Sequence, residues 1–353
     1  MRKGWWYALV AVVVIVGSVA TSLIASEGSH TSRSIQTIGP TLSNVFYPSQ
    51  LLVTGNRAWI LYSGGTGTSG GVRALQLSSG IGFVTVNSSH LEVPTAMTMF
   101  DGSLWIAQSL DGVSGSPDLL KVDPATGRVQ DEFVVLGDPV GLVASHGVLY
   151  VLNDADGSVT IYSVAGVATG GFTLSRVPAI DSSMFGVLGG NKLVVVANTY
   201  PFFGYVALVS LDSHDTDWSN KVAGSLGPPL VVGSNVYVEQ VSSRSTSIDE
   251  YSLENGSLVQ STKVAEGASG ESAPNFLDTV DGELIFGVSG LKEVCAMPID
   301  GHRVAVCRQL QGIPDDAVVS GSDLYLFESI GDSATSATRA VIQRITSFSK
   351  TFG

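Results

Sequence analysis

Positive charge is scarce in this sequence. Of its 353 residues 14% are charged, and 31 acidic residues against 18 basic ones give a formal net charge of −13 at pH 7. The longest basic run is the pair formed by Arg2 and Lys3. Nucleic-acid binding needs clustered basic side chains that neutralise phosphates, so we expect no nucleic-acid partner.

Recognisable catalytic motifs are also missing. The sequence has no H-E-x-x-H metal motif, and its glycine-rich run Gly64–Gly71, which contains one G-x-S-x-G match, has no helix pattern after it. Its five histidines are scattered, as His30, His90, His146, His214 and His302. We therefore predict no catalytic residue, no cofactor and no metal ligand. A repeat fold can gather distant residues at a central channel, so an enzyme remains the less favoured alternative.

Cysteine is rare, and the two that occur are Cys295 and Cys307. Both lie in one predicted hairpin, at equal distances from a turn centred on Gly301. Opposed residues in a non-hydrogen-bonded antiparallel pair lie about 4.5 Å apart at Cα, at the short end of what a disulfide tolerates. We predict a cross-strand disulfide, with free thiols or a redox role as the alternative.

One long uncharged run is present, from Trp5 to Ala25. A helix of about 20 apolar residues spans a bilayer core, and the basic pair before this run favours a cytoplasmic N-terminus. We expect residues 1–4 to form a cytoplasmic tip, 5–25 a transmembrane helix and 26–33 a flexible tether. The alternative is a signal peptide cleaved near Ala20, which would leave a secreted protein. Both alternatives export the rest of the chain.

Glycine is abundant, at 41 residues, and many glycines mark a repeat. Seven segments carry a Gly-containing turn followed by a hydrophobic strand, with spacings of 46, 45, 44, 43, 48 and 40 residues between the strand centres. Those centres are Trp59, Trp105, Tyr150, Val194, Tyr237, Ile285 and Tyr325. A period of about 44 residues built from short β-rich runs is typical of propeller blades.

The second half of each unit is a strand, a polar turn and another strand. In the turn Asp123–Gly127, proline presets φ and the final glycine permits a left-handed conformation. The sequence therefore predicts an all-β fold over residues 34–353, a seven-bladed β-propeller of four-stranded antiparallel blades. The last unit has little room for a fourth strand, so we expect Ser34–Ile38 to pair with the last strand and close the ring.

The second unit carries a family resemblance. DGSLWIAQ at Asp101–Gln108 followed by LLKVDPATGRV at Leu119–Val129 resembles a blade of the quinoprotein-like bacterial propellers, which include the YVTN-repeat and virginiamycin-B-lyase-like groups. The resemblance implies ligand or partner surfaces at the mouth of the channel and on the loops. The lyases of this group use a histidine and acidic residues with a metal, but no motif here matches those positions.

An aromatic run in the fourth unit contains Tyr200, Phe202, Phe203 and Tyr205. Such a run either packs between blades or forms an exposed loop that contacts a partner.

The sequence therefore favours a membrane-tethered extracytoplasmic propeller that acts as a binding or scaffold module for a protein or cell-envelope partner. Two alternatives remain. One is a lyase or quinoprotein-like enzyme with its site at the channel mouth, and the other is an accessory subunit of a membrane complex.

Overall fold

The computed structural model describes residues 35–43, 45, 48–62, 70–80, 82–86, 91–109, 118–135, 137–145, 147–154, 156–177, 183–199, 203–242, 245–266, 276–299, 305–331 and 339–346. The chain divides into two units, Met1–Arg33 and Ser34–Gly353, and every described residue belongs to the second. The expected cytoplasmic tip, apolar helix and tether lie outside the described residues. Among the described residues, no helix has the length and apolar character needed to cross a bilayer.

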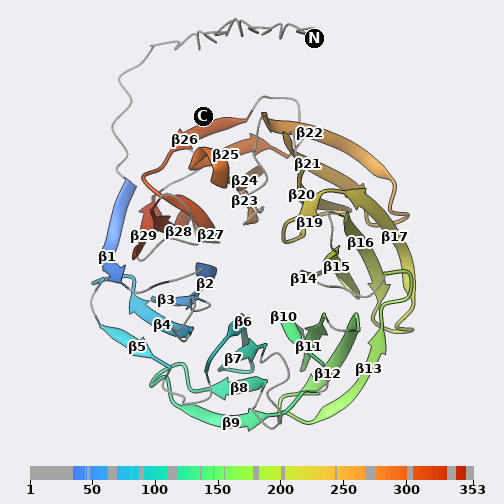
Figure 1. Cartoon of the computed structure of the whole chain (residues 1–353), viewed down its shortest axis with the longest axis horizontal. Helices are drawn as coiled ribbons and strands as arrows, with labels where there is room; N and C mark the ends of the chain where they lie inside the picture. The colour runs from blue at the N-terminus through green and yellow to red at the C-terminus, as the bar shows by residue number, and fades with distance from the viewer. Residues whose placement is uncertain are drawn as a thin grey trace, which may run out of the picture. The chain divides into compact units, whose positions relative to one another are not determined.

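The described strands form seven antiparallel sheets that stand around a common centre (Figure 1). We number these sheets as blades in chain order. Blade 1 contains β2 (Pro48–Thr54), β3 (Arg57–Tyr62), β4 (Gly71–Gln76) and β5 (Phe83–Thr85), and blade 2 contains β6 (Pro94–Phe100), β7 (Ser103–Gln108), β8 (Leu119–Val122) and β9 (Val129–Phe133). Blade 3 contains β10 (Pro139–Ser145), β11 (Val148–Asn153), β12 (Ser158–Ser163) and β13 (Ala168–Thr173). Blade 4 contains β14 (Ser183–Leu188), β15 (Lys192–Thr199), β16 (Phe203–Ser210) and β17 (Thr216–Ala223).

Blades 5 to 7 follow the same plan with small departures. In blade 5 two short strands share the inner position, and in blade 6 a single 3-10 turn, η1 (Ser289–Leu291), follows the second strand. Blade 5 contains β18 (Ser225–Leu226), β19 (Leu230–Val232), β20 (Asn235–Val241), β21 (Ser245–Ser252) and β22 (Leu258–Glu266). Blade 6 contains β23 (Leu277–Val280), β24 (Glu283–Val288), β25 (Glu293–Pro298) and β26 (Val306–Gln309). Blade 7 contains β27 (Ile313–Ser320), β28 (Asp323–Ile330), β29 (Arg339–Ile345) and, from the start of the chain, β1 (Ile35–Ser43).

The predicted all-β propeller of seven blades is confirmed, and each of the seven predicted strand centres lies in the second strand of its blade. These second strands are buried on both faces. In β7, Leu104 and Ile106 pack into a cluster with blade 1, whereas Trp105 and Ala107 pack into a cluster with blade 3. A single blade leaves both faces apolar, so only stacking around the ring removes them from water.

The ring closes through strands from opposite ends of the chain. β1 pairs antiparallel with β29, with Ile35 opposite Ile345 and Ile38 opposite Ile342. The pairing continues past an irregularity to Ser43, so β1 is longer than the closing strand expected from the sequence. Blade 7 thereby obtains its outer strand, and its inner strand β27 contacts β2 of blade 1.

Candidate functional site

The inner strands of the first three blades are joined by polar side chains. Gln50 on β2 accepts a hydrogen bond from the backbone amide of Met97 on β6, at 2.7 Å from its Oε1. The hydroxyl of Thr95 on β6 donates to the carbonyl oxygen of Pro139 on β10, at 2.7 Å. Each bond crosses from one blade to the next, so the backbone of an inner strand is satisfied by its neighbour.

Two carboxylates make the equivalent connection in the last blades. Asp278 Oδ2 on β23 accepts a bond from the amide of Val319 on β27, at 2.8 Å. Asp316 Oδ2 on β27 accepts one from the amide of Leu51 on β2, at 2.6 Å. The other oxygen of each carboxylate accepts a bond from the amide of the residue that follows it. Both acids therefore bridge blades.

Burial changes the titration of these acids. Removal from water raises the pKa of Asp316 to about 8 and also raises the pKa of Asp278, while the amide donors oppose the shift in each case. Because both carboxyls already bind backbone amides on two blades, we assign them to holding the ring together rather than to chemistry on a ligand.

A second pair of buried acids lies in blade 7. Glu328 Oε2 accepts a bond from the amide of Gly312 at 3.2 Å, while its Oε1 has no partner among the described residues. Asp315 accepts a bond from the hydroxyl of Ser329 at 2.5 Å. Burial raises the pKa of Glu328 to about 7 and raises that of Asp315, with the neighbouring carboxyls adding to the latter shift. Glu328 therefore exchanges its proton within the physiological range.

The described residues contain one group of side chains gathered at metal-ligand distances, namely Glu293, Cys295 and Cys307. The predicted disulfide is confirmed, since Cys295 and Cys307 lie opposite each other on β25 and β26, with their Cα atoms 4.0 Å apart, and are bonded through sulfur. Sulfur in a disulfide is no longer a thiolate ligand, so this group is a structural staple.

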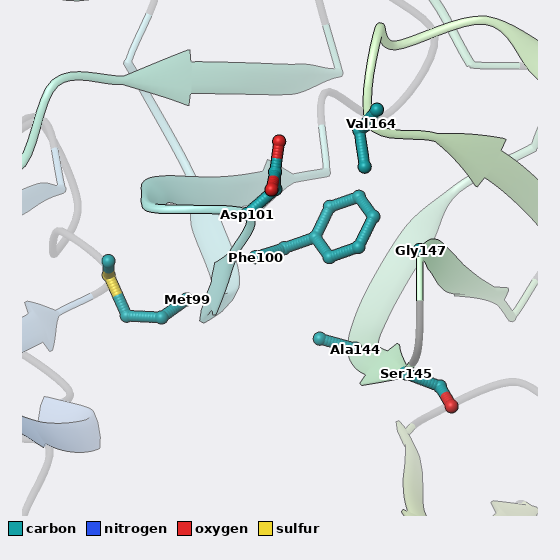
Figure 2. Close-up of a pocket in the computed structure, with 7 residues that line it drawn as sticks. All are labelled: Met99, Phe100, Asp101, Ala144, Ser145, Gly147 and Val164. Atoms are coloured by element: carbon teal, nitrogen blue, oxygen red, sulfur yellow. The ribbon is translucent and has the colours of Figure 1, made fainter.

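A shallow pocket of about 270 Å³ lies between blades 2 and 3 (Figure 2). Its walls come from the β6–β7 turn, the β10–β11 turn and the β12–β13 turn. The lining is mostly apolar with two polar side chains, Asp101 and Ser145, and consists of Met99, Phe100, Asp101, Ala144, Ser145, Gly147 and Val164. Metabolite pockets are usually larger and more enclosed, so the size suits one side chain of a bound protein.

The β12–β13 turn, which we call the valine turn (Ser163–Val167), extends this apolar surface. Val164 is 37% exposed and lines the pocket, and Val167 is 60% exposed. The turn packs closely against blade 2, because Gly166 lies against the ring of Phe133 on β9. A Cβ at position 166 would lie 2.1 Å from that ring, so only glycine fits there. Exposed apolar side chains on a fixed turn are a frequent feature of partner contacts.

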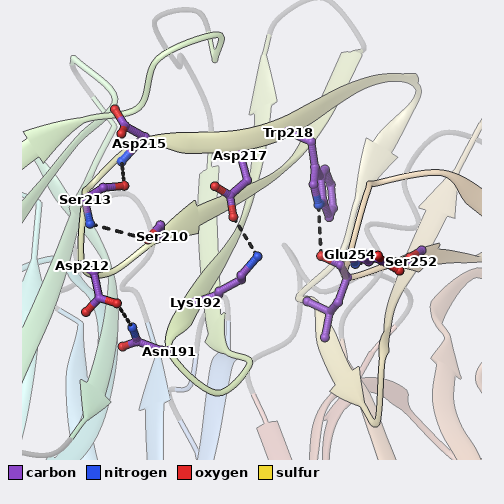
Figure 3. A network of polar contacts seen from close by, with 11 residues as sticks. Asn191, Lys192, Ser210, Asp212, Ser213, Asp215, Asp217, Trp218, Ser252 and Glu254 are labelled. Atoms are coloured by element: carbon purple, nitrogen blue, oxygen red, sulfur yellow. Dashed lines mark hydrogen bonds and ion pairs between the residues drawn. The ribbon is translucent and has the colours of Figure 1, made fainter.

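A polar network surrounds the β16–β17 turn, which we call the acidic turn (Leu211–Asp215) (Figure 3). Asn191 donates to Asp212 at 2.6 Å, and Lys192 pairs with Asp217 at 2.8 Å. Asp215 is exposed, and no described side chain donates to its carboxylate. The turn therefore presents net negative charge to solvent.

The acidic turn reaches blade 3 through its histidine. The ring of His214 stacks on the ring of Phe172 of β13, with centroids 4.7 Å apart and planes at 12°. His214 has a positive φ of 61°, which the tight turn imposes. The valine turn and the acidic turn thus lie at opposite ends of the same outer strand.

The predicted aromatic loop is described only in part. Tyr200 and Phe202 lie outside the described residues. Phe203 is 38% exposed, and the Lys221 ammonium lies 3.8 Å from its ring centroid. Tyr205 is partly buried and packs against the apolar cluster between blades 3 and 4. The two described aromatics therefore divide between the two interpretations, one exposed and one packed between blades.

Sequence reasoning missed the residues that join the inner strands. A periodic proline would have indicated the inner strands. Pro48, Pro94 and Pro139 each begin an inner strand, at spacings of 46 and 45 residues, and after each of them the pairing with the second strand shifts register. Pro314 of β27 stands at the same kind of irregularity. Proline marks bulges and edge strands, so this periodicity locates the inner ring.

Comparison with known proteins supports the fold. No family model and no curated protein matches the chain. Among solved structures, the chain is similar to hydrazine synthase from Kuenenia stuttgartiensis, with a TM-score of 0.65 and 14% identity over 90% of this chain and 98% of that chain. It is also similar to BamB from Moraxella catarrhalis, with a TM-score of 0.54 and 13% identity over 87% and 86%.

A third neighbour is the computationally designed protein Ika8, with a TM-score of 0.56 and 10% identity over 88% of this chain and 99% of that chain. These similarities support a β-propeller of the kind that bacterial proteins contain. An enzyme, BamB and a designed protein share the architecture, so at this level of identity the likeness describes the fold alone. Membership in the quinoprotein-like group remains an expectation.

Proposed function

We propose that the chain is a propeller tethered on the outer side of a membrane, where it acts as a binding or scaffold module for a protein partner. One observation carries the binding role. Val164 of the valine turn lines the shallow pocket together with Asp101, and Val167 is exposed on the same turn. Apolar patches with a polar rim are typical of protein-binding sites.

The location outside the cytoplasm rests on two features of the sequence and one of the fold. The uncharged run Trp5–Ala25 follows Arg2 and Lys3, as expected for a single-pass anchor with a cytoplasmic N-terminus. The disulfide between Cys295 and Cys307 is the kind of bond that persists in an oxidising compartment.

The binding role is tested on the full chain, extracted in mild detergent and weighed by native mass spectrometry. We expect a complex with one protein partner, and we expect the double variant Val164→Asp/Val167→Asp to release it, because a charge cannot enter an apolar contact without loss of solvation. The matched control, Leu258→Asp/Val259→Asp on β22, changes two exposed aliphatic residues on another blade and should retain the partner. A chain that is always recovered alone would contradict the proposal.

The location is tested with trypsin added to the outside of cells. Cleavage after Arg33 in the tether should release a propeller fragment in which the two cysteines remain joined until reduction. A chain that resists external trypsin until the membrane is dissolved would place the propeller inside. A propeller already free in the medium would indicate signal-peptide cleavage instead of an anchor.

A further inference from the structure

The outer strands of the blades differ in how their free edges are protected. An outer strand leaves one row of backbone N–H and C=O groups without a strand partner, and proteins protect such edges with charge, proline or short length. Six outer strands have one of these protections: β5 is only three residues long, and β1 contains Pro40. The other four carry charged side chains, namely Asp131 and Glu132 on β9, Asp217 and Lys221 on β17, Lys263 and Glu266 on β22, and Arg308 on β26, which also holds one cysteine of the disulfide.

β13 is the exception among the described outer strands. Its sequence, ATGGFT, has no charge and no proline, and every one of its residues except Phe172 is exposed. In the sheet of blade 3 it is the terminal strand, paired with β12 on one side. Its free edge is therefore open to pairing with another strand.

The direction of the free amides follows from the ladder. The amide of Leu174 donates to Gly157 of the turn before β12, at 3.0 Å. Hydrogen-bonded positions alternate along an antiparallel pair, so Phe172 bonds to β12 while the amides of Gly171 and Thr173 point away from the sheet. Two donors that face outward, two residues apart, are the pattern that an added strand requires.

The two ends of β13 define the chemistry of an occupant. The strand begins next to the valine turn, which offers Val164 and Val167. At its other end Phe172 stacks on His214 of the acidic turn, where Asp212 and Asp215 are exposed. An extended segment along β13 thus meets an apolar surface at one end and negative charge at the other.

We propose that β13 takes up, by strand addition, an extended segment of a protein partner that has a basic residue near one end and an aliphatic residue near the other. This inference rests on the proposed binding function and specifies the surface and partner chemistry for it. Six residues of β13 span about 20 Å, so the segment contributes about seven residues. Backbone pairing supplies the contact, and the charge and the apolar side chain fix its position.

The probe is a seven-residue peptide of alternating Thr and Val with Lys at one end and Leu at the other, made in both sequence directions. Binding to the full chain in detergent is measured by fluorescence anisotropy and by hydrogen exchange of the β13 amides. We expect one direction to bind and to slow exchange at Gly171 and Thr173. A peptide with alternate amides N-methylated should not bind, because it loses its backbone donors.

A matched pair of variants isolates the strand edge. Thr173→Pro removes one outward amide, whereas Thr173→Ala keeps it, and neither change alters the ladder to β12. We expect Thr173→Pro to weaken peptide binding by about fivefold or more, and Thr173→Ala to leave it within about twofold. Equal binding by the two variants, or by the N-methylated peptide, would overturn strand addition.

A second pair isolates the charge. Asp212→Asn/Asp215→Asn should weaken the Lys peptide by about fivefold, and a peptide with Glu in place of Lys should bind the parent chain more weakly still. If the chain instead pairs with itself, analytical ultracentrifugation will show a dimer that Thr173→Pro dissociates, and a second copy replaces the basic segment as occupant.

The outcomes separate this inference from the function on which it rests. If the peptide fails to bind but Val164→Asp/Val167→Asp still releases a protein partner, the strand edge is unused and the binding function stands. If the full chain never carries a partner and the peptide fails as well, both proposals are wrong.

Discussion

The inner ring and the outer rim of this propeller treat their exposed backbone in different ways. On the inner strands, polar side chains of one blade bind the backbone of the next, as Asp316 does with Leu51 and Gln50 with Met97. On the rim, six of the seven outer strands are protected by charge, proline, a disulfide or short length, and β13 lacks such protection. The comparison indicates that contacts between inner strands stabilise the ring, whereas an outer strand can keep backbone groups available for a partner.

The largest effect is expected where an inner bond is lost. Asp316→Leu leaves the amides of Leu51 and Ala317 without an acceptor, so the free energy of unfolding should fall by about 3 kcal/mol. Asp316→Asn keeps an acceptor oxygen and should cost about 1 kcal/mol. Denaturant unfolding of the purified protein measures both. If the Leu variant were as stable as the parent, the inner ring would not depend on these side chains.

A pH profile sharpens the same comparison. Asp316, with a folded pKa of about 8, and Glu328, with one of about 7, bind protons more tightly in the folded protein than in the unfolded chain, where the usual values are 3.8 and 4.5. The stability that this gives is complete below about pH 4 and is lost as the pH rises through 7 and 8.

The melting temperature should therefore fall between pH 5 and pH 8. Glu328→Gln cannot ionise, so it should flatten the part of the profile between pH 5 and pH 7, as scanning calorimetry will measure. A melting temperature that rises across this interval would contradict the burial of these acids.

The smallest effect is expected on the rim, at two adjacent glycines of β13. A Cβ at Gly171 would lie 2.8 Å from the carbonyl oxygen of Val159, whereas a Cβ at Gly170 would meet nothing within 4 Å. Gly171→Ala should cost about 1 kcal/mol, and Gly170→Ala should be neutral or stabilise by a few tenths of a kcal/mol. Thermal unfolding of the two variants side by side measures the difference, and an equal effect at both positions would mean that the strand adjusts freely.

The repeat, the number of blades and the disulfide could be predicted because each is written in local sequence. The turn glycine Gly127 is an example, since the left-handed conformation expected there is observed, with a φ of 73°. The opposed cysteines are another, since equal distance from a turn fixes which residues face each other.

The site could not be predicted in the same way. Asp278 binds the amide of Val319, about 40 residues later in the chain, and Asp316 binds the amide of Leu51, 265 residues earlier. No local sequence pattern predicts contacts over such separations. The surface that joins Phe172 to His214 depends on how far blade 3 and blade 4 lie apart, which only the packed ring determines. The pattern of hydrophobic residues in the sequence predicts each blade, whereas the contacts between blades can be identified only once the whole ring is assembled.

The pairing of β1 with β29 also sets an order of events. Synthesis yields β1 first and its partner β29 about 300 residues later, so the first strand waits unpaired while six blades are completed. A chain shortened before Arg339 would leave β1 with nothing to join and blade 7 with two strands. Completion of the last strand is thus the step that closes the ring, and we expect a truncated product, with its open strand edges, to aggregate.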